Sequence, residues 1–378
     1  MDAGRFDSDV VVIGGGPGGS ATAITCALLG LRVRLLERHS FPAERPGETL
    51  HPGVEPVLAQ LGVADRLASV VGSRHEGIRI CWGGTTRFEP YGHDDSGPWR
   101  GYQVWRPDFD AMLLNRAREL GVQVFQPCSA IEVLQTHGVV AGVQTSAGPM
   151  TAPIVVDASG RSHWLGTKLG IERSVHSPPL VARYGYAEGS LPALDRSPSL
   201  VGDSSGWLWT AMIRPGLYQW AQVAFDGHRY PASWRPDEFR RLIPHGPPRG
   251  ADVTWRLSRR TADPGWFLVG DAAAILDPTS AKGILKALLS GITTGKLISA
   301  VVTGTAPADE VAALYNDWLS GWFISDRNQL ANFYLSLGVP HFQSINRKVP
   351  KAAGLKCSTG YCGRIVRLHL GKVSERWM

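Results

Sequence analysis

The sequence predicts a mixed α/β protein: a parallel β-α-β domain that carries an inserted antiparallel sheet and is followed by helices. Four consecutive β-branched apolar residues, Val10–Ile13, predict a strand buried on both faces, and the small apolar run 21–29 predicts a helix after it. A second buried strand is expected at 33–36. Residues 218–225 alternate between polar and apolar types, as in an antiparallel sheet.

The turn between the first strand and the first helix holds five glycines in six positions, with Pro17 among them. Gly14, Gly16 and Gly19 match the G-x-G-x-x-G spacing, in which the glycines permit a tight turn, close approach of a pyrophosphate and close helix packing. Glu37 ends the second strand, near the position of the acid that accepts ribose hydroxyls. The pattern predicts a Rossmann-like dinucleotide site; a glycine-rich turn with a purely structural role is the alternative.

Two later segments repeat the pattern of a short buried strand that runs into a turn of glycine and acid. Residues 154–162 contain Asp157 and Gly160, and residues 265–278 contain Gly270 and Asp271. The strand 266–269 is expected to deliver Gly270-Asp271 to the start of another helix, where amides and a carboxylate can meet a ligand. Three such turns indicate an extended ligand.

These motifs occur in one order along residues 9 to about 295: Gly14-x-Gly16-x-x-Gly19, Glu37, Arg45-Pro-Gly-Glu-Thr-Leu50, Val104-Trp-Arg-Pro-Asp-Phe-Asp110, Asp157-Ala-Ser-Gly160, Gly270-Asp271, Asp277-Pro278 and Gly283. In this order the sequence resembles the FAD-dependent monooxygenases of the p-hydroxybenzoate hydroxylase fold. Within them it is similar to the branch that contains flavin-dependent halogenases and flavoproteins that mature quinone cofactors in proteins.

The resemblance implies that FAD is the cofactor. It places Glu37 at the adenosine ribose, Asp271 near the ribityl and pyrophosphate groups, and the Asp-Pro and following glycine beside the isoalloxazine ring. Arg45 and Arg106 are similar to arginines that contact FAD. Two alternatives stay open: Arg106 caps the helix 109–120, and Asp157 caps a turn. The residues expected to bind FAD are Gly14, Gly16, Pro17, Gly18, Gly19, Glu37, Arg38, Arg45, Glu48, Thr49, Arg106, Asp157, Gly160, Gly270, Asp271, Pro278, Lys282, Gly283 and Ile284.

The motif order also implies discontinuous domains. The FAD-binding domain is expected to comprise residues 1–72, 100–170 and 256–300, and the substrate-binding antiparallel sheet residues 73–99 and 171–255. Residues 301–378 are expected to be helical, because apolar residues recur at helical spacing after Asp309.

The chemistry implied by the resemblance is oxidation of an aromatic substrate through a flavin hydroperoxide, with the protein orienting the substrate and excluding water. Halogenases of this branch have a lysine in the segment that here is residues 75–84, and this segment has none. Arg79 cannot replace that lysine, since a guanidinium stays protonated. The segment 206–215 keeps Trp207 and Trp209 of the halogenase Trp-x-Trp-x-Ile-Pro motif but spaces its end differently. Hydroxylation is therefore favoured over halogenation.

Four residues are candidates for catalysis. Trp207 and Trp209 point to one face of a strand and are expected either to line an aromatic pocket or to pack in the sheet core. His51 is expected to be an acid or base near the flavin, or else a surface histidine. Lys282 is expected to offset negative charge on the reduced flavin; a solvated lysine at a helix start is the alternative.

The expected substrate is an aromatic small molecule or a Trp or Tyr side chain of a peptide or protein, as in quinone cofactor biogenesis. Electrons are expected from NAD(P)H or from a separate flavin reductase. Three alternatives remain: a flavin-dependent halogenase, a polyprenyl reductase similar to the geranylgeranyl reductases, and a flavin-bearing maturation partner without catalysis.

Composition excludes several other classes. The net charge of +6 is concentrated in residues 347–376, but no helix-turn-helix, RNA-binding or OB motif accompanies it, so no nucleic-acid partner is expected. No apolar run approaches the ~20 residues of a membrane span, and no signal peptide is evident, so a cytoplasmic protein is expected. The five cysteines suggest neither a disulfide framework nor a metal site; the closely spaced Cys357 and Cys362 are expected to be free thiols.

Overall fold

The structure is a computed structural model that describes residues 6–46, 48–225, 231 and 233–343, with the side chain of Ser280 left out. The basic segment 347–376, with Cys357 and Cys362, lies outside the described residues.

The parallel domain is built on a six-stranded sheet with the order β10-β2-β1-β14-β23-β22. All neighbours in it are parallel except the last pair, β23 and β22. Every residue of β1, β14 and β23 is buried, as expected where helices cover both faces of a sheet. The strands are β10 (Gln123–Phe125), β2 (Val33–Leu36), β1 (Val10–Ile13), β14 (Ile154–Asp157), β23 (Trp266–Leu268) and β22 (Ala262–Asp263).

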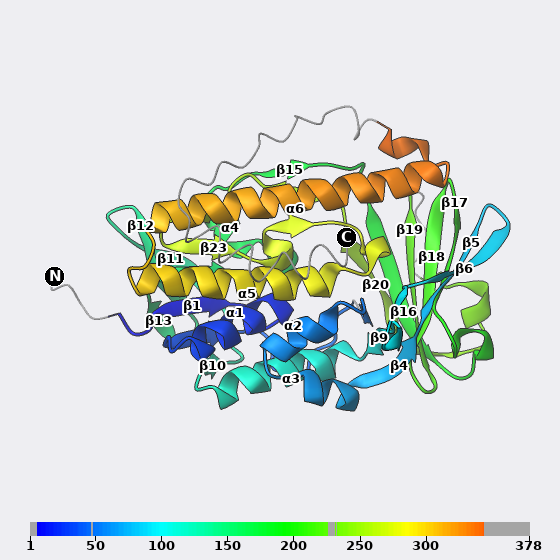
Figure 1. Ribbon diagram of the computed structural model, residues 1–378, viewed down its shortest axis with the longest axis horizontal. Helices are drawn as coiled ribbons and strands as arrows, with labels where there is room; N and C mark the ends of the chain where they lie inside the picture. Colours follow the sequence, from blue (N-terminus) through cyan, green and yellow to red (C-terminus); the bar gives the residue numbers. More distant parts are fainter. Residues whose placement is uncertain (1–5, 47, 226–230, 232, 344–378) are drawn as a thin grey trace.

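Six α-helices occur in the described part of the chain: α1 (Pro17–Leu28), α2 (Val54–Gln60), α3 (Arg106–Glu119), α4 (Trp164–Lys168), α5 (Gly283–Val302) and α6 (Ala308–Ser336). Figure 1 shows the long helices α5 (yellow) and α6 (orange) side by side across the molecule, with α1 beneath α5. Helix α1 lies very close to α5, since a Cβ on Gly291 would come within 2.3 Å of the carbonyl oxygen of Gly18. Small residues at this crossing bring α5 directly over the glycine turn.

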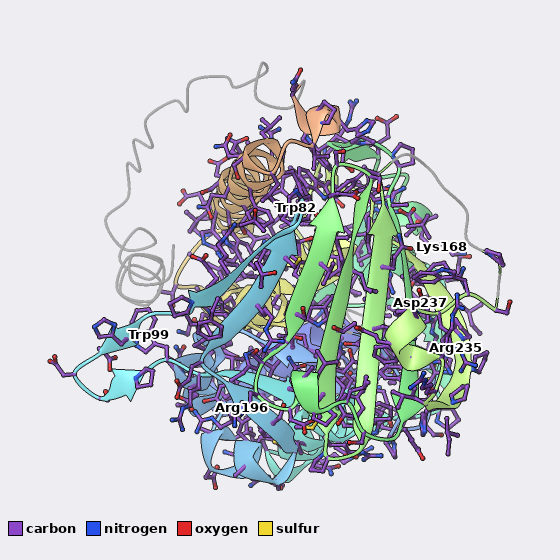
Figure 2. All side chains as sticks on the ribbon, turned by 90° about the vertical axis from the view of Figure 1, so that its right-hand side faces the viewer. Trp82, Trp99, Lys168, Arg196, Arg235 and Asp237 are labelled. Carbon is purple, nitrogen blue, oxygen red and sulfur yellow. The ribbon has the colours of Figure 1, made fainter. Side chains whose placement is uncertain are left out.

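The second large sheet has seven strands in the order β20-β16-β19-β18-β17-β5-β6, and faces the viewer in Figure 2. All its neighbours are antiparallel except β17 and β5. Trp82, labelled in Figure 2, ties β5 to the end of α6 through a hydrogen bond of 2.7 Å to the carbonyl of Leu337. The strands are β20 (Ile243–Asp252), β16 (Val181–Glu188), β19 (Leu217–Ala224), β18 (Gly206–Arg214), β17 (Ser199–Asp203), β5 (Gly77–Trp82) and β6 (Thr85–Pro90).

Smaller sheets connect these layers. They are formed by β11 (Ala130–Thr136), β12 (Val139–Thr145) and β13 (Gly148–Thr151); by β15 (Arg173–Val175), β21 (Arg256–Ser258) and β24 (Ala274–Ile275); by β3 (Thr49–Leu50), β9 (Gly101–Val104) and β4 (Val71–His75); and by β7 (His93–Asp94) with β8 (Gly97–Pro98).

The architecture confirms the predicted fold class, a Rossmann-like domain with an antiparallel sheet and C-terminal helices. The domain boundaries stay a prediction. Gly270-Asp271 begins a helix, as expected, but this helix is only a single 3₁₀ turn, Gly270–Ala272. The chain then forms the short strand β24 and a second turn before α5 starts at Gly283.

Helix α5 bears on the expectation about membrane segments. Its 20 residues are long and apolar enough to cross a membrane by length and composition, although 61% of the qualifying window is buried inside the protein. In the structure α5 is packed between α1 and α6 as a core helix.

Candidate functional site

A cavity of about 900 Å³ runs from the glycine turn to the seven-stranded sheet. Its walls come from segments far apart in the chain. Gly16, Pro17 and Gly18 line it at one end, and Trp207 and Trp209 from β18 at the other. Between them lie the ends of β14 and β23 and the first turn of α5.

The glycine turn has the geometry that its spacing predicts. Gly14 has φ of +104°, and a Cβ there would lie 2.4 Å from the carbonyl oxygen of Ala158. A Cβ on Gly19 would lie 1.9 Å from the carbonyl oxygen of Gly14, whereas one on Gly16 would meet only Nη1 of Arg45, at 3.8 Å. Gly14 and Gly19 are thus required by packing, and Gly16 keeps its open face toward the cavity. No side chain caps α1, so its N-terminal amides also face this end.

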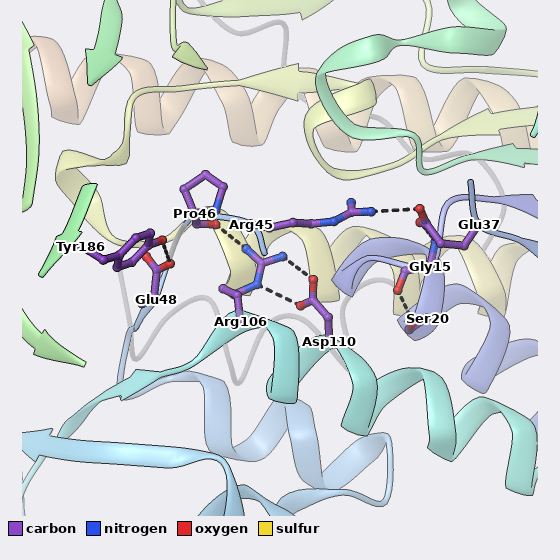
Figure 3. Close-up of polar contacts among 9 residues, drawn as sticks. All are labelled: Gly15, Ser20, Glu37, Arg45, Pro46, Glu48, Arg106, Asp110 and Tyr186. Atoms are coloured by element: carbon purple, nitrogen blue, oxygen red, sulfur yellow. Dashed lines mark hydrogen bonds and ion pairs between the residues drawn. The ribbon is translucent and has the colours of Figure 1, made fainter. Parts of the chain in front are cut away.

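Glu37 lies behind the glycine turn and is almost fully buried. Its carboxylate accepts hydrogen bonds from the amides of Gly15 (2.8 Å) and His39 (3.0 Å) and from Nη2 of Arg45 (3.0 Å). Figure 3 shows Arg45 reaching across to Glu37. Arg38 and Arg45 line the cavity, and Glu37 does not. Glu37 therefore already shapes the turn as a structural acceptor.

Arg106 begins α3 and is held from two sides (Figure 3). Its guanidinium makes a bidentate pair with Asp110 at 2.9 and 2.7 Å and donates to the carbonyl of Pro46 at 2.6 Å. Burial lowers the pKa of Arg106, but the adjacent Asp110 outweighs it, so the pKa lies above its usual value. Arg106 lines the cavity as a fixed cation.

Glu48 also lines the cavity and is buried. It accepts a hydrogen bond from Nε2 of Gln219 at 2.5 Å and one from the hydroxyl of Tyr186. Figure 3 shows the contact between Glu48 and Tyr186. Thr49 follows on the cavity wall, where β3 begins.

Asp157, at the end of β14, is completely buried and lies behind the cavity wall, whereas Gly160 is part of it. The Asp157 carboxylate accepts the amides of Ser159 and Leu165, each at 2.8 Å. Burial raises its pKa from the usual value. This geometry matches the alternative in which Asp157 caps a turn.

Gly270 and Asp271 both line the cavity. Gly270 has φ of +57°, in the left-handed region that favours glycine. Asp271 is exposed to the cavity, whose surrounding protein desolvates its carboxylate and raises its pKa; Arg161, Arg106 and Lys286 lower it in part.

The loop that leads into α5 is anchored by the buried Asp277. Its carboxylate accepts from Nε1 of Trp255 (2.8 Å), the amide of Thr279 (3.0 Å) and the hydroxyl of Tyr334 on α6 (3.0 Å). Pro278, Gly283 and Ile284 line the cavity, but Lys282 does not. Lys282 is the residue before α5, where it lies near enough to His51 to affect its titration.

Two of the four catalytic candidates line the cavity and two do not. Trp207 and Trp209 both line the cavity, and Nε1 of the buried Trp207 donates to the hydroxyl of Tyr334 at 3.0 Å. His51 does not line it; its Nδ1 accepts the amide of Gly53, and burial, helped by Lys282, lowers its pKa to about 4. The catalytic roles of His51 and Lys282 stay predictions that the cavity does not support.

The structure brings two charged residues to the cavity that the sequence reading missed. Lys286, in the first turn of α5, contacts Asp326 of α6, and both line the cavity. The available signals were weak: Lys286 is one helical turn after Lys282 inside an apolar helix, and Asp326 shares a helix face with Leu319 and Phe323.

No residue of the segment 75–84 lines the cavity. His75 is buried and bonded to the side chain of Gln103, and Arg79 donates to the carbonyl of Ala193. The segment therefore has no lysine and, in addition, does not reach the cavity.

Comparison with known proteins decides the cofactor. Residues 7–185 match the family model described as "FAD binding domain". This part of the chain is therefore similar to the FAD-binding domains that this model describes, and FAD is the cofactor. The protein is an FAD-dependent enzyme. The open face of Gly16, the unpaired start of α1 and the cationic wall of the cavity fit this cofactor, whose phosphates need amide and cationic donors.

Several relatives of this FAD-dependent enzyme are halogenases. It is 27% identical to a tryptophan 2-halogenase of Chondromyces crocatus over 86% of this chain and 67% of that protein. It is 28% identical to the 1H-pyrrole-2-carbonyl-[peptidyl-carrier protein] brominase of Pseudoalteromonas luteoviolacea (strain 2ta16), over 83% of this chain and 82% of that protein. A digeranylgeranylglycerophospholipid reductase of Methanothrix thermoacetophila is 27% identical over 87% and 88%.

Among solved structures, the myxobacterial chondrochloren halogenase CndH superposes with a TM-score of 0.74 at 25% identity, over 97% of this chain and 90% of that one. The comparisons therefore support the predicted flavoprotein branch. They favour the halogenase alternative over the hydroxylation that the sequence reading placed first. They provide no support for a role in quinone cofactor maturation.

Proposed function

We propose that this enzyme uses reduced FAD and O₂ to transfer oxygen to an aromatic substrate held in the cavity. The observation that carries the proposal is the continuity of one cavity from the glycine turn and Asp271 to the indole rings of Trp207, Trp209 and Trp322. Indole walls bind aromatic rings by stacking and edge contacts. FAD, when bound, supplies the oxidising chemistry.

In this proposal the chain itself binds, orients and excludes water. Gly16 and the start of α1 receive the phosphates, with Arg38, Arg45 and Arg106 as cations beside them. Glu37 holds the glycine turn in shape, and binding of the adenosine ribose by Glu37 stays a prediction that the cavity wall does not support. Asp271 accepts hydrogen bonds from the ribityl chain. Asp277 fixes the loop in which Pro278 and Gly283 border the ring, so that the substrate meets the cofactor in one orientation.

A second candidate function is halogenation, which the halogenase relatives favour. One feature of the cavity also supports halogenation: Lys286 places an amine on the cavity wall. Against it stands the segment 75–84, which has no lysine and does not reach the cavity. The ammonium of Lys286 is moreover already held by Asp326.

The deciding experiment supplies the FAD-loaded enzyme with chemically reduced FAD, O₂ and an aromatic probe, free tryptophan or a tryptophan-containing peptide, with and without bromide. We expect mass spectrometry to show product that has gained oxygen, at a rate that bromide does not change. A brominated product that disappears in Lys286→Met would establish halogenation instead. Replacing reduced FAD by NADPH, with and without an added flavin reductase, identifies the electron donor.

The same assay addresses the remaining alternatives. A maturation partner without catalysis would consume no reductant above the background when the aromatic probe is added. A reductase similar to the relative from Methanothrix thermoacetophila would instead consume reductant with a polyprenyl lipid and without O₂.

A further inference from the structure

Strand β6 (Thr85–Pro90) forms one edge of the seven-stranded sheet, and all of its residues are exposed. Its pairing with β5 runs without a register shift, so the strand is regular along its whole length. Among the described residues, no strand pairs with its outer side. Trp82 of β5, labelled in Figure 2, marks this side of the sheet. An exposed, regular edge is a template on which another strand can pair.

The opposite edge of the same sheet is protected. Strand β20 contains Pro244, Pro247 and Pro248, and a proline has no N–H to offer to a neighbouring strand. Strand β6 has a single proline, Pro90, at its last position. The two edges therefore differ, since β20 resists the addition of a strand and β6 can accept one.

The backbone groups that β6 offers follow from its pairing with β5. The amide of Tyr91, directly after β6, donates to the carbonyl of Glu76 at 3.0 Å. Bonded positions alternate along an antiparallel pair, so every second residue before Tyr91, back to Thr85, also bonds to the β5 side. The N–H and C=O groups of Thr86 and Phe88 therefore point to the open side of the strand.

The side chains of β6 are complementary to themselves around Phe88. Arg87 and Glu89 lie on one face, where Nε and Oε2 form an ion pair of 3.1 Å and the side chains are 47% and 58% exposed. Phe88, which is 53% exposed, lies on the other face. In an antiparallel pair of two copies with Phe88 opposite Phe88, each Arg87 lies opposite a Glu89. The neighbouring bonded registers place Arg87 opposite Arg87 or Glu89 opposite Glu89, so the charges select one register.

We infer that two copies of this chain join through their β6 edges, so that one sheet continues across a two-fold axis. A two-fold contact needs a surface that is complementary to itself, and the sequence of charges on β6 has this property. A partner of another kind would not require it. Among the described residues that line the cavity, none belongs to β6, so the contact leaves the cavity of each copy free.

The test uses the FAD-loaded enzyme in sedimentation velocity over a wide range of protein concentrations, where we expect a monomer–dimer equilibrium. Arg87→Glu and Glu89→Arg each place like charges opposite one another, so each should weaken dimerisation about tenfold. Both side chains are exposed, so the variants should fold and retain FAD. The double variant Arg87→Glu/Glu89→Arg brings opposite charges together again and should have the dissociation constant of the unchanged enzyme.

A mixture of the two single variants tests the register directly. One variant then carries two acids on β6 and the other two arginines, so a heterodimer regains both cross-strand ion pairs and should be about tenfold tighter than either homodimer. The matched controls are Lys168→Glu and Glu132→Arg, which reverse the charges of a surface pair of 2.8 Å on α4 and β11 (Lys168 in Figure 2). They should leave dimerisation unchanged. Thr86→Pro removes one outward N–H without removing a bond to β5, and it should weaken the dimer.

A monomer at every concentration overturns the inference. A dimer that both single charge variants leave unchanged also overturns it, because the contact would then lie elsewhere. A mixture of the single variants that is no tighter than each variant alone would exclude the register with Phe88 opposite Phe88. These outcomes are independent of the proposed reaction, because β6 is not part of the cavity wall.

Discussion

Tyr334 of α6 donates a hydrogen bond of 3.0 Å to Oδ1 of Asp277, a residue 57 positions earlier in the chain. The same hydroxyl receives a hydrogen bond from Nε1 of Trp207. One phenol therefore links the C-terminal helix, the loop before α5 and the aromatic end of the cavity.

Tyr334→Phe should lower the free energy of unfolding by about 1–3 kcal/mol, because buried Trp207 and Asp277 each lose a partner. It should also shift the flavin absorbance spectrum, since the loop beside the ring loses an anchor. The matched control is Tyr315→Phe, which removes a buried hydroxyl of the same helix that donates to the carbonyl of Leu268 at 2.8 Å. A similar loss of stability with an unchanged spectrum is expected there; equal spectra in both variants would contradict the anchoring role.

Gly16 and Gly19 should respond differently to the same change. Gly16→Ala places a methyl group in open space at the cavity, so the FAD-free protein should keep its melting temperature while its affinity for FAD falls. Gly19→Ala forces a methyl group against the carbonyl of Gly14 and should destabilise the fold itself. Thermal unfolding without FAD, followed by FAD titration, separates the two effects. Tight FAD binding by Gly16→Ala would show that the phosphates lie elsewhere.

Glu37→Ala should weaken both folding and FAD binding. The buried amide of Gly15 loses its acceptor, which costs about 1–3 kcal/mol of unfolding free energy. Glu37→Gln keeps an acceptor oxygen and should retain most of the stability while still binding FAD less tightly, because it lacks the charge. Denaturant unfolding of the FAD-free variants and fluorescence titration with FAD test this. Full FAD affinity in both variants would place the adenosine ribose away from Glu37.

His75 should make stability depend on pH. Burial lowers its pKa in the folded protein to about 4, below the value of about 6.5 for an unfolded histidine. The unfolded chain therefore binds more protons between these values, and stability present above pH ~6.5 is lost as pH falls toward ~4. At pH ~5 the loss should be about 2 kcal/mol. His75→Gln should reduce the slope of this part of the profile in urea unfolding, leaving the share of His51, whereas the exposed His137→Gln should not change it.

Lys282→Met should lower the flavin reduction potential if the ammonium offsets charge on the reduced ring, by an amount equivalent to about 1 kcal/mol. Lys282 does not line the cavity, so this measurement decides whether its ammonium acts on the flavin at all. Potentials are measured with the protein-bound flavin, and Lys168→Met is the control on the surface. Identical potentials in the three proteins would remove Lys282 from the catalytic candidates.

The sequence predicted the parts of the site that depend on local geometry. Backbone conformation and close packing demand glycine at Gly14 and Gly19, and Gly16 between them leaves an open face toward the cavity, all within six residues. The length of the helix at Gly270 was not predicted, because a strand followed by Gly-Asp does not by itself distinguish a long helix from a 3₁₀ turn.

The contacts between distant segments could not be predicted in this way. The residues around Asp277 in the sequence do not indicate its hydrogen bond with Tyr334, and those around Lys286 do not indicate its ion pair with Asp326. A lysine in the first turn of a helix has the same local pattern whether it meets water or a carboxylate of another helix. The contribution of α6 to the cavity was therefore not predicted.

The position of β23 in the six-stranded sheet has a consequence for the expression of fragments of this protein. A fragment that ends near residue 185 would lack β23, which pairs with β14, and α5, whose glycines pack against α1. It would expose a bare sheet edge and an apolar helix face to solvent, both of which favour aggregation. Expression of that fragment alone should give insoluble material, whereas co-expression with residues 256–343 offers it the strand and the helices it lacks.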